Sequence, residues 1–111
     1  MRRGQLYLAK YDPVVGSEIG KTRPALIVQN NYGNKFSNIV ICVSITRLHD
    51  LELATLVHVK ESMFGLEKPS TINCSQIRSL DKSRLVHKIG ELDEETMQRV
   101  DEALKISIDL I

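Results

Sequence analysis

The stretch VGSEIGKTRPALIVQN, residues 15–30, decides how the rest of the chain is arranged. Its first half is rich in glycine and small polar residues, which is typical of an irregular loop. Residues 25–28 are an apolar run with β-branched members, which predicts a buried strand. Arg23 precedes Pro24, and the residue before a proline is held in extended backbone. We therefore expect a guanidinium group at the mouth of a strand, a common place for catalytic and binding residues.

Length and composition indicate an ordinary folded protein. The 111 residues predict one domain, 1–111, with a single modest core. Apolar residues make up 42% and charged residues 26%, as in globular proteins generally. The sequence has neither the pattern of a signal peptide nor an apolar run of membrane-spanning length, so we expect a cytoplasmic location without membrane contact.

The net charge of +1 conceals an asymmetry between two parts of the chain. Residues 1–90 carry 13 Lys and Arg against 7 Asp and Glu, whereas residues 91–111 carry 2 against 7. If the acidic segment packs on one side, the remaining surface is basic and attracts polyanions. This permits a nucleic-acid partner, although some of the acids belong to the start of a helix.

The cysteines and histidines predict no metal site and no cofactor. Cys42 and Cys74 lie in strand-like runs, without a second cysteine or histidine at the spacing of metal ligands. We expect both to be buried free thiols. The three histidines are scattered along the sequence.

Hydrophobic patterning predicts six short strands and one terminal helix. The strands are expected at residues 5–11, 24–29, 38–45, 54–60, 71–78 and 84–89. A long loop is expected at 14–22, turns at 12–13, 30–34 and 81–83, and a short helical turn at 61–64. Short strands at close intervals predict a small antiparallel barrel. Two strands are apolar on both faces, and together they present more apolar surface than a single small barrel can bury. We therefore expect a symmetric homodimer.

The last two elements carry specific expectations about faces. In the strand at 71–78, alternation puts Ile72, Cys74, Gln76 and Arg78 on one face. The terminal helix is expected to begin at the acidic run Asp93-Glu94-Glu95, because negative charge is stabilising at a helix amino terminus. Its packing stripe is expected to comprise Met97, Val100, Leu104, Ile108 and Ile111.

Several segments together resemble the MazF/PemK family of toxin endoribonucleases. They are Gly16-Ser17-Glu18, Gly20-Lys21-Thr22-Arg23-Pro24, Gln29-Asn30, Gln76-Ile77-Arg78, and 92–95 with 100–104. The opening Arg3-Gly4-Gln5-Leu6-Tyr7 and Asp12-Pro13 also agree. Their order and spacing match over nearly the whole chain.

The resemblance implies a dimeric SH3-like barrel of the plasmid-toxin (CcdB/PemK-like) type that cleaves single-stranded RNA without a metal ion. It implies that Arg23 acts as acid/base and charge stabiliser and that Thr46 assists at the phosphate. Ser17, Glu18, Lys21 and Gln76 would help to hold RNA, and a MazE-like antitoxin would cover the same groove. The RNA supplies its own 2′-hydroxyl nucleophile, giving 2′,3′-cyclic phosphate and 5′-hydroxyl ends.

The sequence departs from the family at two places and leaves other functions open. Ser75 stands where members often have Glu, and residues 54–56 read Ala-Thr-Leu where many have Pro-Thr-His, so the cleavage sequence does not follow from the resemblance. A gyrase-binding toxin of the CcdB type uses a tryptophan near its carboxyl end, and this chain has none. A peptide-binding SH3-like module needs more aromatic residues than two Phe and three Tyr. A non-cleaving RNA-binding domain would show the same basic face.

Overall fold

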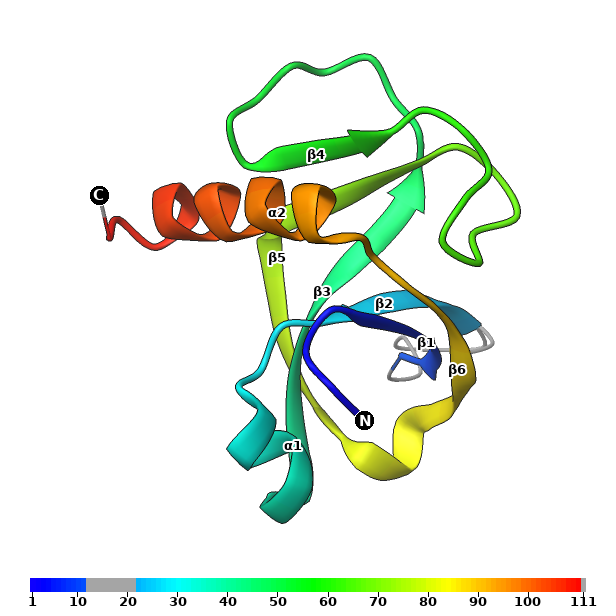
Figure 1. The fold of residues 1–111 in the computed structure, drawn as a ribbon, viewed down its shortest axis with the longest axis vertical. Helices are drawn as coiled ribbons and strands as arrows, with labels where there is room; N and C mark the ends of the chain where they lie inside the picture. Colours follow the sequence, from blue (N-terminus) through cyan, green and yellow to red (C-terminus); the bar gives the residue numbers. More distant parts are fainter. Residues whose placement is uncertain (12–21, 111) are drawn as a thin grey trace, which may run out of the picture.

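A computed structural model describes residues 1–11 and 22–110 and has the elements that the patterning predicts, with one added helix (Figure 1). In chain order they are β1 (Gln5–Lys10), β2 (Thr22–Ile27), α1 (Asn31–Phe36), β3 (Ile39–Arg47), β4 (Leu56–Val59), β5 (Ser70–Asp81), the 3₁₀ turn η1 (Lys82–Arg84), β6 (Leu85–Glu91) and α2 (Glu94–Ser107). The strands form one sheet in the order β4-β5-β3-β2-β1-β6, and every neighbouring pair is antiparallel.

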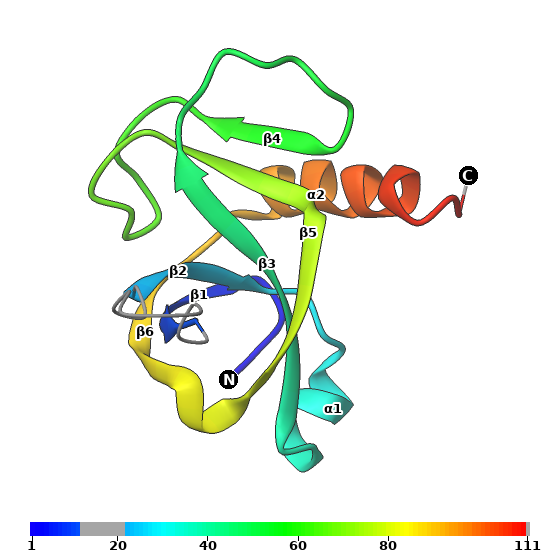
Figure 2. The same cartoon turned by 180° about the vertical axis from the view of Figure 1, so that it is seen from behind.

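The sheet bends strongly, so that its two faces serve two different cores. In Figure 1 and Figure 2, β1, β2 and β6 curl against the first half of β3 and the second half of β5 and form a small ring. The end of β3 and the start of β5 run to β4 and α2. This confirms a mainly β fold, a small antiparallel barrel with a carboxyl-terminal helix.

Strands β2 and β3 contribute to both cores. Leu26 and Val43 belong to the larger core, which α2 covers, and Ala25, Ile27 and Cys42 belong to the smaller core on the opposite face. All five side chains are fully buried. Two-sided burial therefore explains why these strands read as continuous apolar runs rather than as alternating ones.

Strand β5 departs from the expected alternation because its pairing with β3 shifts register. Asn73 lies opposite Ser44 and Ile77 opposite Val43, so residues 74–76 are extra on β5. Such a bulge bends a strand and changes which face the following residues occupy.

The bulge makes one face assignment wrong. Ile72 and Cys74 do share the larger core, but Arg78 lies opposite Cys42 and so faces the smaller core. Gln76 lies within the bulge and is exposed. Simple alternation fails here because it assumes one partner residue for every residue of the strand.

Two loop predictions also need correction. Residues 30–34 are not a simple turn, because α1 begins there with Asn30 as its cap, whose side chain accepts a hydrogen bond from the Gly33 N–H at 2.8 Å. Residues 61–64 form no helical turn. Phe64 and Gly65 have φ values of +58° and +89°, in the left-handed region, which turns the chain sharply before β5.

Helix α2 begins as predicted but packs with a different stripe. Asp93 caps it by accepting a hydrogen bond from the Thr96 N–H at 2.8 Å, and Glu94 and Glu95 follow in the first turn. Val100 is buried, and Met97 and Leu104 pack against the larger core. Thr96 and Ala103 complete the buried set, whereas Ile108 follows the helix and is 54% exposed. Ile111 lies outside the described residues.

The described helices are all too short, or too polar, to cross a membrane; α2, the longest, has 14 residues.

The loop before β5 closes the structure by packing its backbone against β6. Gly65 and Gly90 meet there without side chains between them. A Cβ atom on Gly90 would overlap the carbonyl oxygen of Phe64, and one on Gly65 would overlap the carbonyl oxygen of Ile89. Both glycines are therefore required by close backbone approach.

We expect Gly90→Ala to lower the free energy of unfolding by about 3 kcal/mol, because the new methyl group must displace rigid backbone. Urea unfolding followed by circular dichroism measures the change. The matched control is His87→Ala, an exposed position on the same strand, which should stay within about 0.5 kcal/mol of the parent. Equal stability of Gly90→Ala and the parent would contradict this contact.

Candidate active site

Arg23 and Thr46 line one pocket from neighbouring strands. The β2–β3 ladder pairs Ala25 with Ser44, and Arg23 and Thr46 each lie two residues beyond that pair, at the start of β2 and near the end of β3. Alternation puts Arg23 on the face of Ala25 and Thr46 on the face of Ser44, which is the same face of the sheet. Arg23 is exposed and Thr46 is half-buried. The two residues that the resemblance singles out thus share a face where β2 begins and β3 ends.

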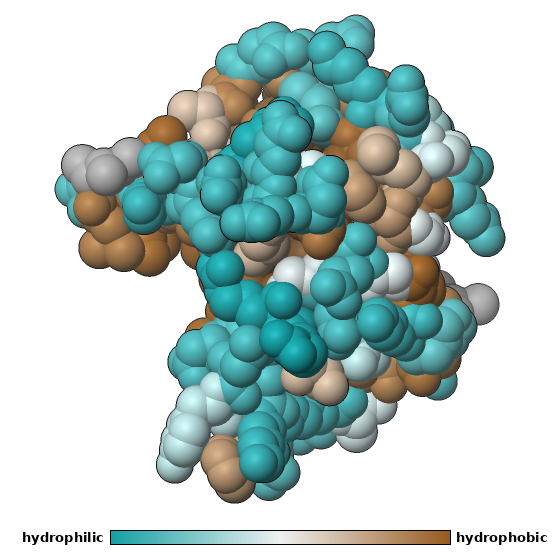
Figure 3. Space-filling view, viewed as in Figure 1, coloured by the Kyte–Doolittle hydropathy of each residue, from teal (hydrophilic) through white to brown (hydrophobic). Residues whose placement is uncertain are grey.

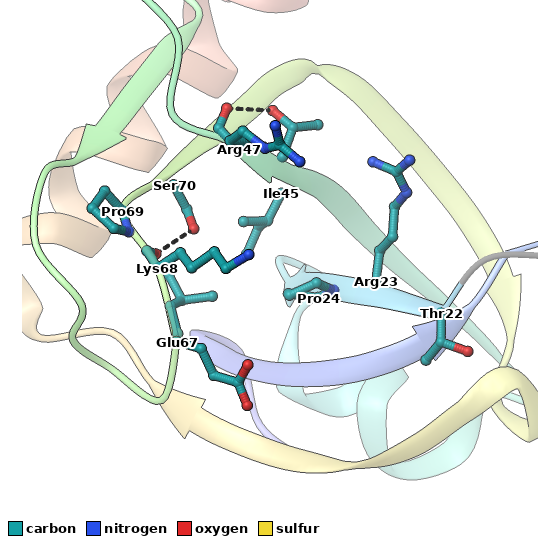
Figure 4. A pocket seen from close by; sticks show the side chains of 11 residues that line it. Thr22, Arg23, Pro24, Ile45, Arg47, Glu67, Lys68, Pro69 and Ser70 are labelled. Carbon is teal, nitrogen blue, oxygen red and sulfur yellow. Dashed lines mark hydrogen bonds between the residues drawn. The ribbon is translucent and has the colours of Figure 1, made fainter.

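A pocket of about 500 Å³ opens at this point (Figure 4). One wall comes from the start of β2 and the end of β3, and the other from the loop before β5. The described lining residues are Thr22, Arg23, Pro24, Ile45, Thr46, Arg47, Leu66, Glu67, Lys68, Pro69 and Ser70. The walls thus join segments that lie far apart in the sequence.

The charged residues of the pocket lining are mostly cationic. Arg23, Arg47 and Lys68 supply three positive charges, against the single carboxylate of Glu67. In Figure 4 the three cationic side chains extend into the space between the walls, and Glu67 points away from the guanidinium groups. Such an arrangement attracts anions, and forked guanidinium donors match phosphate oxygens.

Lys68 is the site residue that sequence reasoning missed. It precedes Pro69 just before β5, as Arg23 precedes Pro24 in β2, so both cations sit in backbone that the following proline keeps extended. The hydroxyl of Ser70 donates a hydrogen bond to the Lys68 carbonyl at 2.8 Å and fixes the turn. A basic residue before a proline at a strand entrance was the signal that could have found it.

The hydroxyl of Thr46 is only weakly held. It donates to the Arg47 carbonyl at 3.4 Å, a long hydrogen bond. Little is therefore lost when this hydroxyl turns toward a ligand oxygen in the pocket.

Of the other predicted binding residues, the structure describes only Gln76. Ser17, Glu18 and Lys21 lie in 12–21, outside the described residues. Gln76 is exposed on the bulge of β5 and is not among the described residues that line the pocket.

The thiols have the inert character expected of them. Cys42 and Cys74 are free and buried. Burial raises the pKa of Cys42 to about 11 and that of Cys74 to about 12, so both are neutral thiols at physiological pH. Over residues 1–11 and 22–110, no group of three or more His, Cys, Asp or Glu side chains is placed to hold a metal ion.

These features define a small β-barrel protein with a basic pocket at the end of its sheet. Residues 2–108 match the family model described as PemK-like, MazF-like toxin of type II toxin-antitoxin system. The chain belongs to this family.

Similar proteins support the same assignment. Endoribonuclease EndoA of Bacillus subtilis is 46% identical over 112 residues, covering 100% of this chain and 97% of the relative. Endoribonuclease MazF of Staphylococcus saprophyticus is 45% identical, covering 99% and 92%. Among solved structures, a mycobacterial endoribonuclease in complex with its cognate antitoxin superimposes with a TM-score of 0.79 at 26% identity, covering 100% of this chain and 97% of that one.

Proposed function

We propose that this protein is an endoribonuclease toxin that cuts single-stranded RNA, without a metal ion, in the pocket between β2, β3 and the loop before β5. The observation that carries the proposal is that Arg23 and Thr46 line one pocket with an excess of positive charge. The two relatives at 45–46% identity are both named endoribonucleases.

The reaction needs positioning and charge stabilisation more than a protein nucleophile. The 2′-hydroxyl of the RNA attacks the adjacent phosphorus and loses its proton to water, while the bond to the 5′-oxygen breaks and that oxygen takes up a proton from water. The products are a 2′,3′-cyclic phosphate and a 5′-hydroxyl. The negative charge on the phosphorane oxygens is the quantity that the protein must stabilise.

Arg23 and Thr46 fit different parts of this task. The guanidinium group stays protonated in proteins, so Arg23 acts as a fork of donors to the phosphorane oxygens rather than as a base. The hydroxyl of Thr46 donates a further hydrogen bond from the neighbouring strand. Ser17, Glu18, Lys21 and Gln76 are proposed to hold the flanking nucleotides.

We further propose that a MazE-like antitoxin inhibits the enzyme by covering the pocket. A mycobacterial relative has been solved with its cognate antitoxin. The three cations of the pocket would attract an acidic segment as they attract RNA. A cytoplasmic location, where both RNA and an antitoxin are present, is part of this proposal.

The proposed active form is a homodimer. Ile41 and Ile77 are 38% and 37% exposed on one face of the β3–β5 ladder, and Ile106, Ile108 and Leu110 are 44–67% exposed at the end of α2. Figures 1 and 2 place the end of α2 on the same side as the first half of β3 and the second half of β5. Figure 3 shows apolar side chains gathered below the end of α2. A second copy would cover this apolar surface.

Arg23→Ala should reduce cleavage of a long single-stranded RNA by at least about a hundredfold, the scale for losing one transition-state donor. Thr46→Val should also impair cleavage, whereas Thr46→Ser keeps the hydroxyl and most activity. Gel analysis with end-group mapping measures the outcome. Arg99→Ala, an exposed arginine on α2, is the matched control and should cleave normally. A folded and fully active Arg23→Ala would refute its role, and intact RNA with the parent would favour a non-cleaving RNA-binding protein.

Cleavage should persist in excess EDTA, because the proposed chemistry draws its donors from Arg23 and Thr46 alone. Rates with EDTA and with added Mg²⁺ are compared at constant ionic strength, since salt by itself weakens RNA binding. A requirement for the divalent ion would overturn the metal-independent mechanism.

Ile77→Asp should convert the dimer to a monomer, because it introduces a charge into the surface that a second copy covers. Val86→Asp is the control: Val86 is 47% exposed on β6, and its substitution should leave the dimer intact. Sedimentation velocity at micromolar concentration measures both variants. A monomeric parent protein would contradict the proposal.

A further inference from the structure

A second arginine is held on the concave face of the sheet by an aromatic ring. The guanidinium carbon of Arg78, on β5, lies 4.8 Å from the centre of the Tyr11 ring. Tyr11 directly follows β1, so the contact joins β1 to β5, which β2 and β3 separate in the sheet. A cation over an aromatic face is attracted by the ring quadrupole, and this fixes the orientation of a flexible arginine.

Strand register puts Arg78 and Arg23 on the same face. Arg78 lies opposite Cys42, which lies opposite Ile27 of β2. Arg23 is four residues before Ile27 on that strand, so its side chain points to the same side. The bulge in β5 is what turns Arg78 to this face.

Both arginines contribute to the electrostatics of Tyr11. Burial raises the pKa of Tyr11, and the nearby Ser44 hydroxyl and the charges of Arg78 and Arg23 oppose the rise, with Arg78 acting more strongly than Arg23. The charges of both guanidinium groups therefore act on the Tyr11 hydroxyl.

Resting on the proposed ribonuclease function, we propose that Arg78 binds a second RNA phosphate, neighbouring the one at Arg23, and that Tyr11 is the positioning residue that holds Arg78 for this contact. The backbone of single-stranded RNA presents phosphates in succession, and two oriented guanidinium groups on one concave face bind two of them. This gives the substrate strand a defined path from the pocket across the smaller core.

The chemistry of the pair favours a phosphate as the ligand. Stacking uses the flat face of the guanidinium group, whereas its N–H donors lie in its plane and point outward. A forked set of donors held in one plane matches phosphate oxygens. Arg78 is half-buried, so its contact is made against the sheet rather than in bulk water.

The number of phosphate contacts is measured by the salt dependence of binding. The probe is a fluorescein-labelled pool of random 12-nucleotide RNA, fully 2′-O-methylated so that it cannot be cleaved. For single strands, each phosphate contact contributes about 0.7 to the slope of log affinity against log salt. Arg78→Gln should weaken binding about tenfold and reduce this slope by about 0.7.

Two variants separate charge from structure at this position. Arg78→Lys keeps the charge and should keep the slope, and Arg99→Gln, the matched charge loss on α2, should leave both affinity and slope unchanged. Circular dichroism confirms that each variant is folded. An unchanged slope in folded Arg78→Gln would overturn the second phosphate contact.

The positioning role of Tyr11 is tested by ring removal with unmodified RNA. Tyr11→Leu should raise KM several-fold with kcat nearly unchanged, and Tyr11→Phe, which retains the ring, should restore the parent KM. A KM for Tyr11→Leu equal to that of the parent would overturn the role. If the parent binds the methylated pool but never cuts unmodified RNA, the proposed function fails while the binding measurements still decide the fate of Arg78.

Discussion

The structure depends on covering both faces of β2 and β3 at once. Their side chains alternate between the two cores, so each strand is buried only when both of its faces are covered. Helix α2 covers one face, and the curl of β1 and β6 against β3 and β5 encloses the other. The backbone contact between Gly65 and Gly90 then ties the loop before β5 to the far edge of the sheet. Because the same loop forms a wall of the pocket, closing the fold also builds the site.

The pocket lies where the two buried strands reach solvent, and this location suits its electrostatics. Arg23, Arg47 and Lys68 gather at strand ends, where their charges remain hydrated while their backbones are fixed by the sheet and by the prolines that follow Arg23 and Lys68. Grouping like charges opposes folding, and an anionic ligand relieves that repulsion. The pocket thus carries its excess of positive charge before a ligand arrives, and in the proposed mechanism this charge stabilises the phosphorane without reorganisation.

The register shift in β5 explains why one strand can serve the larger core, the smaller core and the proposed RNA path. Ile72, before the bulge, and Cys74, its first residue, pack in the larger core under α2. After the bulge, Arg78 faces the same concave surface as Arg23 and lies over Tyr11, and Leu80 packs in the smaller core. A strictly regular strand would have placed Arg78 on the face of Ile72, away from Arg23 and Tyr11.

The sequence by itself determined the six strands, the terminal helix that begins at the acidic run from Asp93, and the two-sided burial of β2 and β3. It also determined the buried thiols and the position of Arg23 in extended backbone at the start of a strand. These follow from local rules, namely hydrophobic period, capping chemistry and the restriction before proline. Only the tertiary structure decided the bulge in β5, the exposure of Ile108, the addition of Lys68 to the pocket and the contact of Tyr11 with Arg78. Each of these depends on which residues distant in the chain become neighbours, and local patterning carries no information about such register and curvature.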